Sequence, residues 1–315
     1  MDEISAGSNS TTGSALRVHE HIERIYSAGA VRGDGGTYQL GTASVTPDRG
    51  RFVRDMCRAA GAHTSVETGM AWGLSTLHIL EALIENGTTE QAHVVMDPAQ
   101  ASVYHNAALH TLRSVGAENL VEFHEEPSEL ALPRMVAQGR RFDFAFIDGD
   151  HDFEHAFVDF AFINRMLNPG GIVVFDDVPL YPVCLTCNIA ESVYGYSVFA
   201  EHFENVRARK AHRALGLGKT LAPLPWMRAY RKPMMPAARN FQIMPLYVGL
   251  PWYRSYASNY LRHEGLLALA DGDRARARRA FLQALRLAPD RLRTYSCLAR
   301  TFLPLSVAKA LSRRR

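Results

Sequence analysis

The sequence has few cysteines, no long apolar run and no leader-like start. Its four cysteines, in 315 residues, are too few for a disulfide framework, which favours a reducing compartment. No stretch of about 18 apolar residues is available to span a bilayer. The polar start MDEISAGSNSTTGS also lacks the basic and apolar regions of a signal peptide. These absences argue against a secreted, disulfide-linked domain and against a membrane-spanning protein, so we expect a cytoplasmic protein.

Only one C-x-x-C pair occurs, formed by Cys184 and Cys187 in CLTC. One such pair supplies half of a zinc site, and no second pair or nearby His-x-x-His completes it. We therefore expect thiols that pack within a helix.

Acidic and basic residues are unevenly distributed. Up to residue 203 there are 27 Asp and Glu against 12 Lys and Arg, whereas from residue 204 onward there are 5 against 23. The basic part suggests an acidic protein partner, an anionic membrane surface, or the acidic half of the same chain, and these three alternatives stay open. We expect no nucleic-acid partner, and the sequence leaves a homo-oligomer open.

Strand-like and helical patterns alternate through the first two thirds of the chain. The runs HTSVET, HVVMD, LVEFHE, FDFAFID and GIVVFDD are short and rich in β-branched or aromatic residues, with helical stretches between them. This alternation predicts βαβ units and a doubly wound α/β domain with a mostly parallel sheet. In such sheets ligands bind at the carboxyl ends of the strands, so the residues after each strand are the candidates for a site.

Composition divides the chain into four parts. We expect a disordered N-terminus over residues 1–14, the α/β domain over 15–225, a basic linker rich in proline and aromatic residues over 226–254, and a helical segment over 255–315. The last part resembles one unit of a tetratricopeptide repeat, which must pack on further helices or a partner because a single unit cannot bury its apolar face.

Glycines follow the first strand of the domain, in VETGMAWGLS. Gly69 and Gly73 permit a tight turn and a close approach of the backbone to a ligand, ahead of a helix N-terminus. Their G-x-x-x-G spacing, preceded by Glu67, differs from the dinucleotide pattern G-x-G-x-x-G and argues against a nicotinamide cofactor.

Carboxylates follow three further strands. Asp97 ends HVVMD, where it is placed to accept hydrogen bonds from ribose hydroxyls. Asp148 ends FDFAFID, and Asp176 and Asp177 end GIVVFDD; adjacent parallel strands lie about 4.8 Å apart, so these groups can converge. Clustered carboxylates repel unless a cation neutralises them, and a hard ion such as Mg²⁺ prefers oxygen ligands. The alternative is that Asp148 caps a helix and the other two begin a loop.

These motifs together resemble the class I S-adenosylmethionine-dependent methyltransferases over about residues 45–205, most closely the bacterial subset with IDGDH and DD after two strands. The resemblance implies a seven-stranded sheet and a cofactor site, with the ribose held by Asp97 and the adenine beside Ser128. The cofactor residues that it implies are Glu67, Gly69, Gly73, Asp97, Ser128 and Asp148. It also implies a Mg²⁺ site in Asp148, Asp176 and Asp177, as in metal-dependent O-methyltransferases.

An alcohol acceptor must lose its proton before it can attack the sulfonium methyl group. Related enzymes use a base in the segment after the fourth strand, where His151 and Asp150 stand; we favour His151 because its unperturbed pKa suits the role. We expect O-methylation of a small-molecule or glycan hydroxyl. The alternative function is a non-catalytic scaffold of the same fold that binds a protein partner through its C-terminal helices.

Overall fold

The computed structural model describes residues 3–204, 225–235 and, with gaps, 258–302. The chain forms two compact units, the first made of residues 1–206 and 223–239 and the second of residues 207–222 and 240–315. Among the described residues, no helix has the combination of length and apolar character that a membrane crossing requires.

A seven-stranded sheet forms the centre of the first unit, with the strand order β5-β4-β3-β6-β7-β9-β8. The strands from β3 to β7 run parallel, and β9 lies antiparallel between β7 and β8. This is the doubly wound, mostly parallel sheet that the alternating pattern predicted. The strands are β3 (Ser65–Thr68), β4 (His93–Met96), β5 (Val121–His124), β6 (Phe142–Ile147), β7 (Leu167–Phe175), β8 (Ser197–His202) and β9 (Met227–Arg231).

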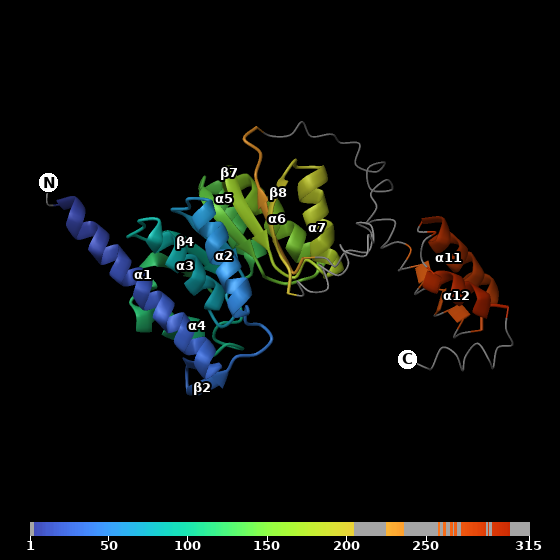
Figure 1. The fold of residues 1–315 in the computed structure, drawn as a ribbon, viewed down its shortest axis with the longest axis horizontal. Helices are drawn as coiled ribbons and strands as arrows, with labels where there is room; N and C mark the ends of the chain where they lie inside the picture. The colour runs from blue at the N-terminus through green and yellow to red at the C-terminus, as the bar shows by residue number, and fades with distance from the viewer. Residues whose placement is uncertain are drawn as a thin grey trace, which may run out of the picture. The chain divides into compact units, whose positions relative to one another are not determined.

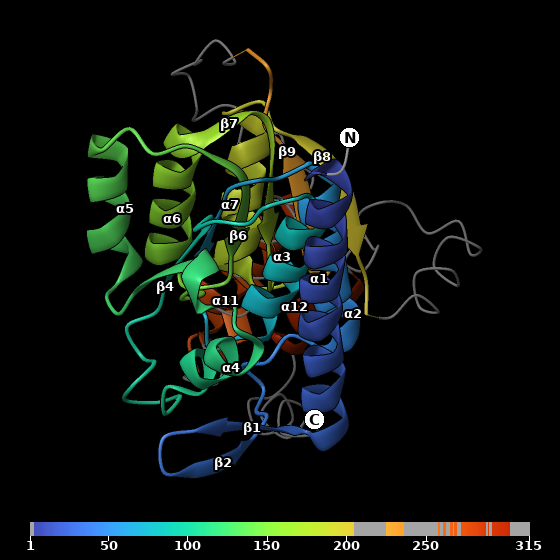
Figure 2. The same cartoon turned by 90° about the vertical axis from the view of Figure 1, so that its left-hand side faces the viewer.

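Helices cover both faces of this sheet (Figures 1 and 2). Side chains alternate along a strand, so Phe144 and Phe146 of β6 pack with α1, α2 and α3, whereas Ala145 and Ile147 pack with α5, α6 and α7. The sheet is therefore buried on both faces, which explains its nearly continuous apolar strands. The helices are α1 (Glu3–Ala28), α2 (Pro47–Ala59), α3 (Leu74–Glu85), α4 (Ala107–Val115), the 3₁₀ turn η1 (Glu118–Leu120), α5 (Ser128–Ala137), α6 (Phe153–Met166) and α7 (Tyr181–Ser192).

The N-terminal helix is longer than the sequence suggested. We expected disorder over residues 1–14, but α1 begins at Glu3. Its later turns are anchored because Val18, Ile22 and Ile25 are buried in the core. Once a helix is nucleated, each added residue gains one hydrogen bond, so the helix extends through a segment rich in Ser, Thr and Gly.

The expected linker over residues 226–254 is also wrong at its start. Residues 227–231 form β9, in which Met227, Ala229 and Tyr230 are fully buried. The flanking prolines suggested an irregular segment, while the strand is specified by its pairing with β7 and β8. The C-x-x-C prediction is confirmed, because Cys184 and Cys187 are buried, unlinked thiols within α7.

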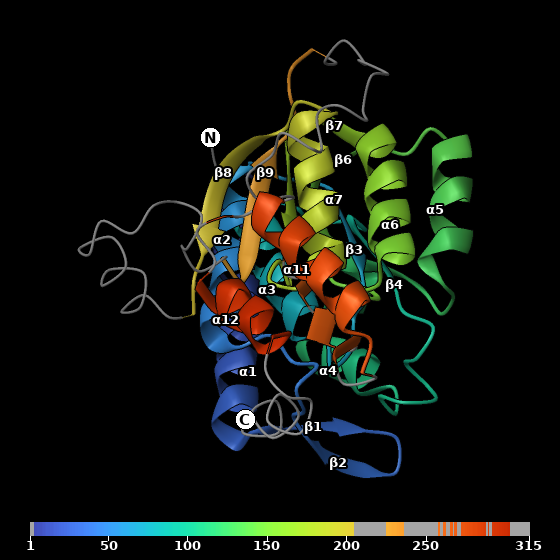
Figure 3. The same ribbon diagram turned by 90° about the vertical axis from the view of Figure 1, so that its right-hand side faces the viewer.

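Two smaller elements complete the described fold. The GDGG turn joins β1 (Ala30–Gly33) to β2 (Gly36–Gln39) as an antiparallel hairpin. In the second unit, α11 (Arg274–Leu287) and α12 (Leu292–Arg300) pack side by side (Figure 3). Gly265 lies against the buried ring of Phe281 there, so closely that a Cβ atom would fall 2.5 Å from that ring. The helix α11 and the helix after it fall within the predicted helical segment 255–315, and the likeness of that segment to a tetratricopeptide unit stays a prediction.

Candidate active site

A cleft of about 530 Å³ opens at the carboxyl ends of β3, β4, β6 and β7. This is the position at which open, doubly wound sheets bind ligands. Eight of the ten predicted site residues line it, whereas Glu67 and Gly73 do not. The eight are Gly69, Asp97, Ser128, Asp148, Asp150, His151, Asp176 and Asp177.

The two glycines after β3 have different roles. Gly69 adopts a φ of +85°, and a Cβ atom there would lie 2.1 Å from the carbonyl oxygen of Asp148. It therefore lets two cleft-lining loops touch. Gly73, at the start of α3, also has a φ of +85°. It packs on Ala108 and lies outside the cleft.

Glu67, which we expected beside the methionine part of the cofactor, is instead buried in the core. Its Oε2 accepts a hydrogen bond from Thr76 (2.7 Å) and lies 2.9 Å from Nε2 of His93. Because side chains alternate along β3, Thr68 lines the cleft and Glu67 points away from it. The residue therefore ties β3 to α3 and β4, and the prediction of cofactor contact is corrected.

Asp97 holds the glycine loop in place from the end of β4. Its Oδ2 accepts hydrogen bonds from the amides of Met70 (3.1 Å) and Ala71 (2.7 Å) and from Nε2 of Gln100 (3.1 Å). Its Oδ1 accepts one from the amide of Ala99 (2.7 Å). Oδ1 accepts only this one hydrogen bond among the described residues, whereas Oδ2 accepts three, so Oδ1 has the room for a further donor.

Ser128 is positioned by a carboxyl group that the sequence analysis missed. Its hydroxyl donates to Oδ1 of Asp159 (2.5 Å), a residue of α6 that is only 1% exposed. Burial raises the pKa of Asp159 to about 6. In the sequence, Asp159 lies within the apolar pattern of a helix. Its only signal there is that it is a charged residue on an otherwise apolar helix face.

Replacing Asp159 by asparagine should stabilise the protein at neutral pH. The folded-state pKa of about 6 lies above the ordinary carboxyl value of 3.8, so ionisation above pH 6 opposes folding. The Asn side chain keeps an acceptor for Ser128 and carries no charge. We expect the free energy of unfolding to rise by up to about 3 kcal/mol at pH 7, and the gain to vanish near pH 4, as measured by urea denaturation.

Asp143→Asn is the matched control with the opposite sign. Burial alone would raise the pKa of Asp143, but hydrogen bonds from Asn168, His63 and Thr64 outweigh it and hold the pKa below its usual value. That carboxylate stabilises the fold above its unfolded pKa, so its removal should destabilise the protein at pH 7. A destabilised Asp159→Asn variant at pH 7 would contradict the assignment.

The acidic end of the cleft contains a group able to hold a metal ion. Ligand atoms of Asp148, His151 and Asp177 lie within 4.8 Å of one another, and Nε2 of His151 is 3.0 Å from Oδ2 of Asp177. Burial, and then the charges of Asp176 and Asp177, raise the pKa of Asp148 well above its usual value. Two carboxylates and an imidazole fit a divalent cation, which would relieve this repulsion.

Asp176 is oriented differently from the prediction. Its Oδ2 lies 3.2 Å from Nη1 of Arg49, a residue of α2 whose guanidinium also stacks on Trp226 and pairs with Glu204. Burial is the main cause that raises the pKa of Asp176, to about 7, and Arg49 opposes it. In this structure the guanidinium from α2 binds Asp176, so Asp176 is not part of the group of Asp148, His151 and Asp177. The metal set of Asp148, Asp176 and Asp177 stays a prediction.

The segment after β6 places the two candidate bases differently. Asp150 is exposed at the cleft, whereas His151 is oriented by Asp177. The cap of α6 is supplied by Asp152, which accepts from the amide of His155 (2.9 Å). Asp148 therefore does not cap this helix, so that part of the alternative is wrong, whereas Asp176 and Asp177 do follow the end of β7 as the alternative had them.

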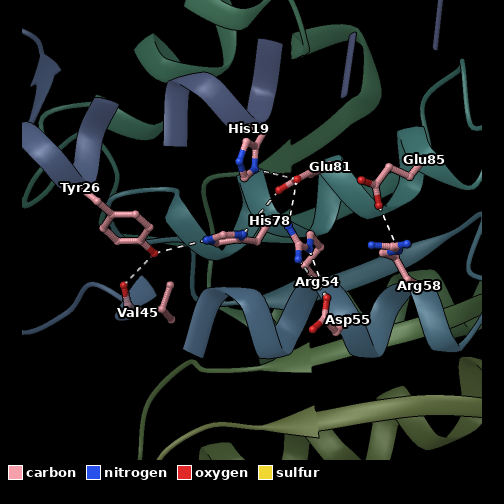
Figure 4. A network of polar contacts seen from close by, with 9 residues as sticks. All are labelled: His19, Tyr26, Val45, Arg54, Asp55, Arg58, His78, Glu81 and Glu85. Atoms are coloured by element: carbon pink, nitrogen blue, oxygen red, sulfur yellow. Dashed lines mark hydrogen bonds and ion pairs between the residues drawn. The ribbon is translucent and has the colours of Figure 1, made fainter. Parts of the chain in front are cut away.

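A partly buried polar network links the helices α1, α2 and α3 and reaches one residue of the cleft (Figure 4). Tyr26 of α1 donates to the carbonyl of Val45 (3.1 Å), a cleft-lining residue, and its oxygen lies 3.4 Å from Nε2 of His78. Glu81 binds Arg54 (3.1 Å) and His19 (3.0 Å), so helices α1, α2 and α3 are linked. Burial lowers the pKa of His78, which favours a neutral imidazole at this junction.

Parts of this chain are similar in sequence to known proteins. The sequence model of a family described as a methyltransferase domain matches residues 66–178. The chain is 28% identical over 137 residues to caffeoyl-CoA O-methyltransferase 2 of Zea mays, covering 42% of this chain and 49% of that protein. It is 29% identical over 136 residues to catechol O-methyltransferase of Niastella koreensis, covering 43% and 58%. The chain spans about half the length of these curated relatives.

Among solved structures, the O-methyltransferase of tomaymycin synthesis from Streptomyces achromogenes, in complex with S-adenosylmethionine, is 16% identical. It aligns with 74% of this chain and 99% of its own, at a TM-score of 0.49. The family match covers β3 to β7 and every strand end that faces the cleft. By sequence, residues 66–178 are therefore similar to a methyltransferase domain, and in this chain they include the parallel strands of a doubly wound sheet.

Proposed function

We propose that this protein transfers a methyl group from S-adenosylmethionine to a hydroxyl oxygen of a small molecule. One observation carries the proposal: a single cleft joins the glycine loop and Asp97 to the group of Asp148, His151 and Asp177. The first part suits a nucleoside cofactor, and the second suits a hydroxyl that must lose its proton. The relatives named as O-methyltransferases support the same reaction.

The cofactor would lie across the ends of β3 and β4. Oδ1 of Asp97 has room for a ribose hydroxyl donor, and Gly69 leaves space for the backbone to approach the amino-acid part. Ser128, fixed by Asp159, would lie at the adenine end. The sulfonium is already activated, so the protein has to align the methyl group with the acceptor oxygen and exclude water.

The acceptor would enter at the acidic end of the cleft. We propose His151 as the base, held in orientation by Asp177, and Asp150 as the exposed alternative. Arg49 lines the same end and brings a positive charge near a developing oxyanion. When bound, a divalent cation held by Asp148 and Asp177 would further lower the pKa of the acceptor hydroxyl.

The acceptor class is proposed on chemical grounds. The cleft lining also includes Thr42 and Ser44, which are polar groups suited to an acceptor rich in hydroxyls. Sugars or glycans are therefore our first choice, and catechols or caffeoyl thioesters, named in the relatives, are the second. The open cleft argues against the scaffold alternative, which requires no cofactor pocket.

The proposal is tested with isotope-labelled S-adenosylmethionine and a panel of sugars, catechols and caffeoyl thioesters, with and without Mg²⁺. Mass spectrometry should detect a labelled methyl ether and S-adenosylhomocysteine as products. Calorimetry that detects no S-adenosylmethionine binding would overturn the proposal and favour the scaffold.

For His151, we expect alanine substitution to lower turnover by about 100-fold at neutral pH. The deficit should shrink as the pH rises, because hydroxide then removes the acceptor proton without a base. The control is His155→Ala, which removes an imidazole that is paired with Asp152 at the same cleft. Mn²⁺ titration separates the two roles of His151. If His151 is only a base, the alanine variant should bind Mn²⁺ with unchanged affinity, whereas if His151 is a metal ligand, the variant should bind Mn²⁺ more weakly.

A further inference from the structure

The β1–β2 hairpin binds the segment that follows Asp97 (Figure 2). The amide of Asp34, in the hairpin turn, donates to the carbonyl of His105 (2.7 Å). Its carboxylate accepts from Nδ2 of Asn106 (2.6 Å) and lies 2.6 Å from Nε2 of His110. Gly33 lies so close that a Cβ atom would fall 2.6 Å from the same His105 carbonyl. The hairpin thus contacts this segment through its backbone and through one carboxylate.

The segment it binds has an unfavourable backbone. His105 and Asn106 are consecutive residues with φ values of 52° and 55°. Residues other than glycine adopt this region uncommonly, Asn and His more often than most, so a consecutive pair in it depends on the contacts around it. Two of the hairpin's hydrogen bonds end on this pair, and a third contact reaches His110 in α4.

Aromatic rings continue the contact toward the cleft. Tyr38 of β2 stacks on His105, with ring centroids 4.1 Å apart and planes inclined by 6°. Trp72, in the glycine loop, lies 6.4 Å from Tyr38 and meets Tyr104 edge-on at 5.1 Å. Tyr104 directly precedes His105 and lines the cleft beside Asp97. The position of Tyr104 is therefore set from both sides by groups that depend on the hairpin.

Tyr104 faces the carboxylates of the cleft. Burial, followed by the charges of Asp97 and Asp148, raises the pKa of its hydroxyl. It remains a neutral hydrogen-bond donor in the space between the proposed ribose and acceptor ends.

We propose that the β1–β2 hairpin is a positioning element of the cofactor site, in which Asp34 and Tyr38 hold His105 and Asn106 so that Tyr104 closes over the nucleoside. This inference rests on the proposed function, because it assumes that the cleft takes a nucleoside cofactor. Asp34 itself is 59% exposed and does not line the cleft, so it acts through the segment that it binds.

The test is calorimetric binding of S-adenosylhomocysteine to the full-length protein. Asp34→Ala should weaken binding by about tenfold, because two side-chain hydrogen bonds to a charged group are lost. Tyr38→Ala should act in the same direction, and Asp34→Asn, which keeps an acceptor for Asn106, should recover part of the affinity. In turnover assays the KM for S-adenosylmethionine should rise while kcat stays near the wild-type value.

Asp55→Ala is the matched control. Asp55 is a 53% exposed carboxylate that accepts two hydrogen bonds from Arg54. It lies on α2 and takes no part in the hairpin contact. It should leave the affinity for S-adenosylhomocysteine unchanged. Hydrogen exchange should quicken over residues 98–106 in Asp34→Ala and stay unchanged there in Asp55→Ala.

The outcomes separate the two proposals. Wild-type protein that binds no S-adenosylhomocysteine would overturn the proposed function and this inference together. Wild-type protein that binds it, with Asp34→Ala and Tyr38→Ala binding equally well, would overturn only the role of the hairpin. If Asp34→Ala lost no more affinity than the control Asp55→Ala, that result would also count against the role of the hairpin.

Discussion

Replacing Asp177 by asparagine is expected to lower methyl transfer by about 100-fold or more, while the affinity for S-adenosylhomocysteine stays within about twofold. Asp177 orients His151 and belongs to the group of Asp148, His151 and Asp177, so the substitution weakens base and cation binding together. Asp97, at the proposed nucleoside end of the cleft, makes no hydrogen bond to Asp177 or His151. Initial rates with and without Mg²⁺, together with calorimetry, measure the two effects separately.

This substitution leaves the backbone undisturbed. Asp177 has a φ of 51°, and asparagine tolerates this left-handed region at least as well as aspartate. Loss of activity would therefore report chemistry and not unfolding, which a thermal melt would verify. Asp148→Asn should act in the same direction as Asp177→Asn.

Asp176→Asn distinguishes the two ligand sets. If Arg49 holds Asp176, as in this structure, the variant should bind Mn²⁺ with nearly unchanged affinity, whereas Asp148→Asn and Asp177→Asn should lose most of it. Equal losses in all three variants would restore the set predicted from the sequence. Full turnover in excess chelator would exclude any role for a cation.

The sequence predicted the parts of the site that depend on position along a strand. Gly69, Asp97 and Asp148 each follow a strand of a parallel sheet, and the topology alone brings such residues to one cleft. Residue type and periodicity are sufficient for that prediction. The same argument located Asp177.

The sequence could not predict the features that depend on contacts distant in the chain. The orientation of Asp176 is set by Arg49, 127 residues away, and the raised pKa of Asp159 by its burial on α6. Glu67 was misplaced because the face that a strand residue points to depends on register, which a motif does not give. The strand β9 is defined by its partners and not by its own pattern.

Polar networks outside the matched family region support two walls of the cleft. Residues 66–178 match the methyltransferase-domain model, whereas Tyr26 and Arg49 lie before that match. Tyr26 holds the cleft-lining Val45, and Arg49 binds Asp176. Residues before the matched region therefore help to shape the cleft.

Substituting Gly69 by alanine should remove cofactor binding and destabilise the fold. The added Cβ atom would lie 2.1 Å from the backbone oxygen of Asp148, so the loops after β3 and β6 must separate, and no flexible side chain can absorb the shift. We expect roughly 1–3 kcal/mol of packing strain in addition to about 1 kcal/mol for alanine at positive φ. The affinity for S-adenosylhomocysteine should fall by at least about tenfold, measured by calorimetry beside a thermal melt.

Gly87→Ala isolates the clash from the backbone effect. Gly87 follows α3 with a φ of +92°, close to the +85° of Gly69, and a Cβ atom there would meet nothing within 4 Å. Its replacement should carry only the conformational cost and leave the cleft intact. The difference between the two variants then measures the contact of Gly69 with Asp148. If both variants lost equal stability and both bound S-adenosylhomocysteine normally, the close approach of these loops would have no part in forming the site.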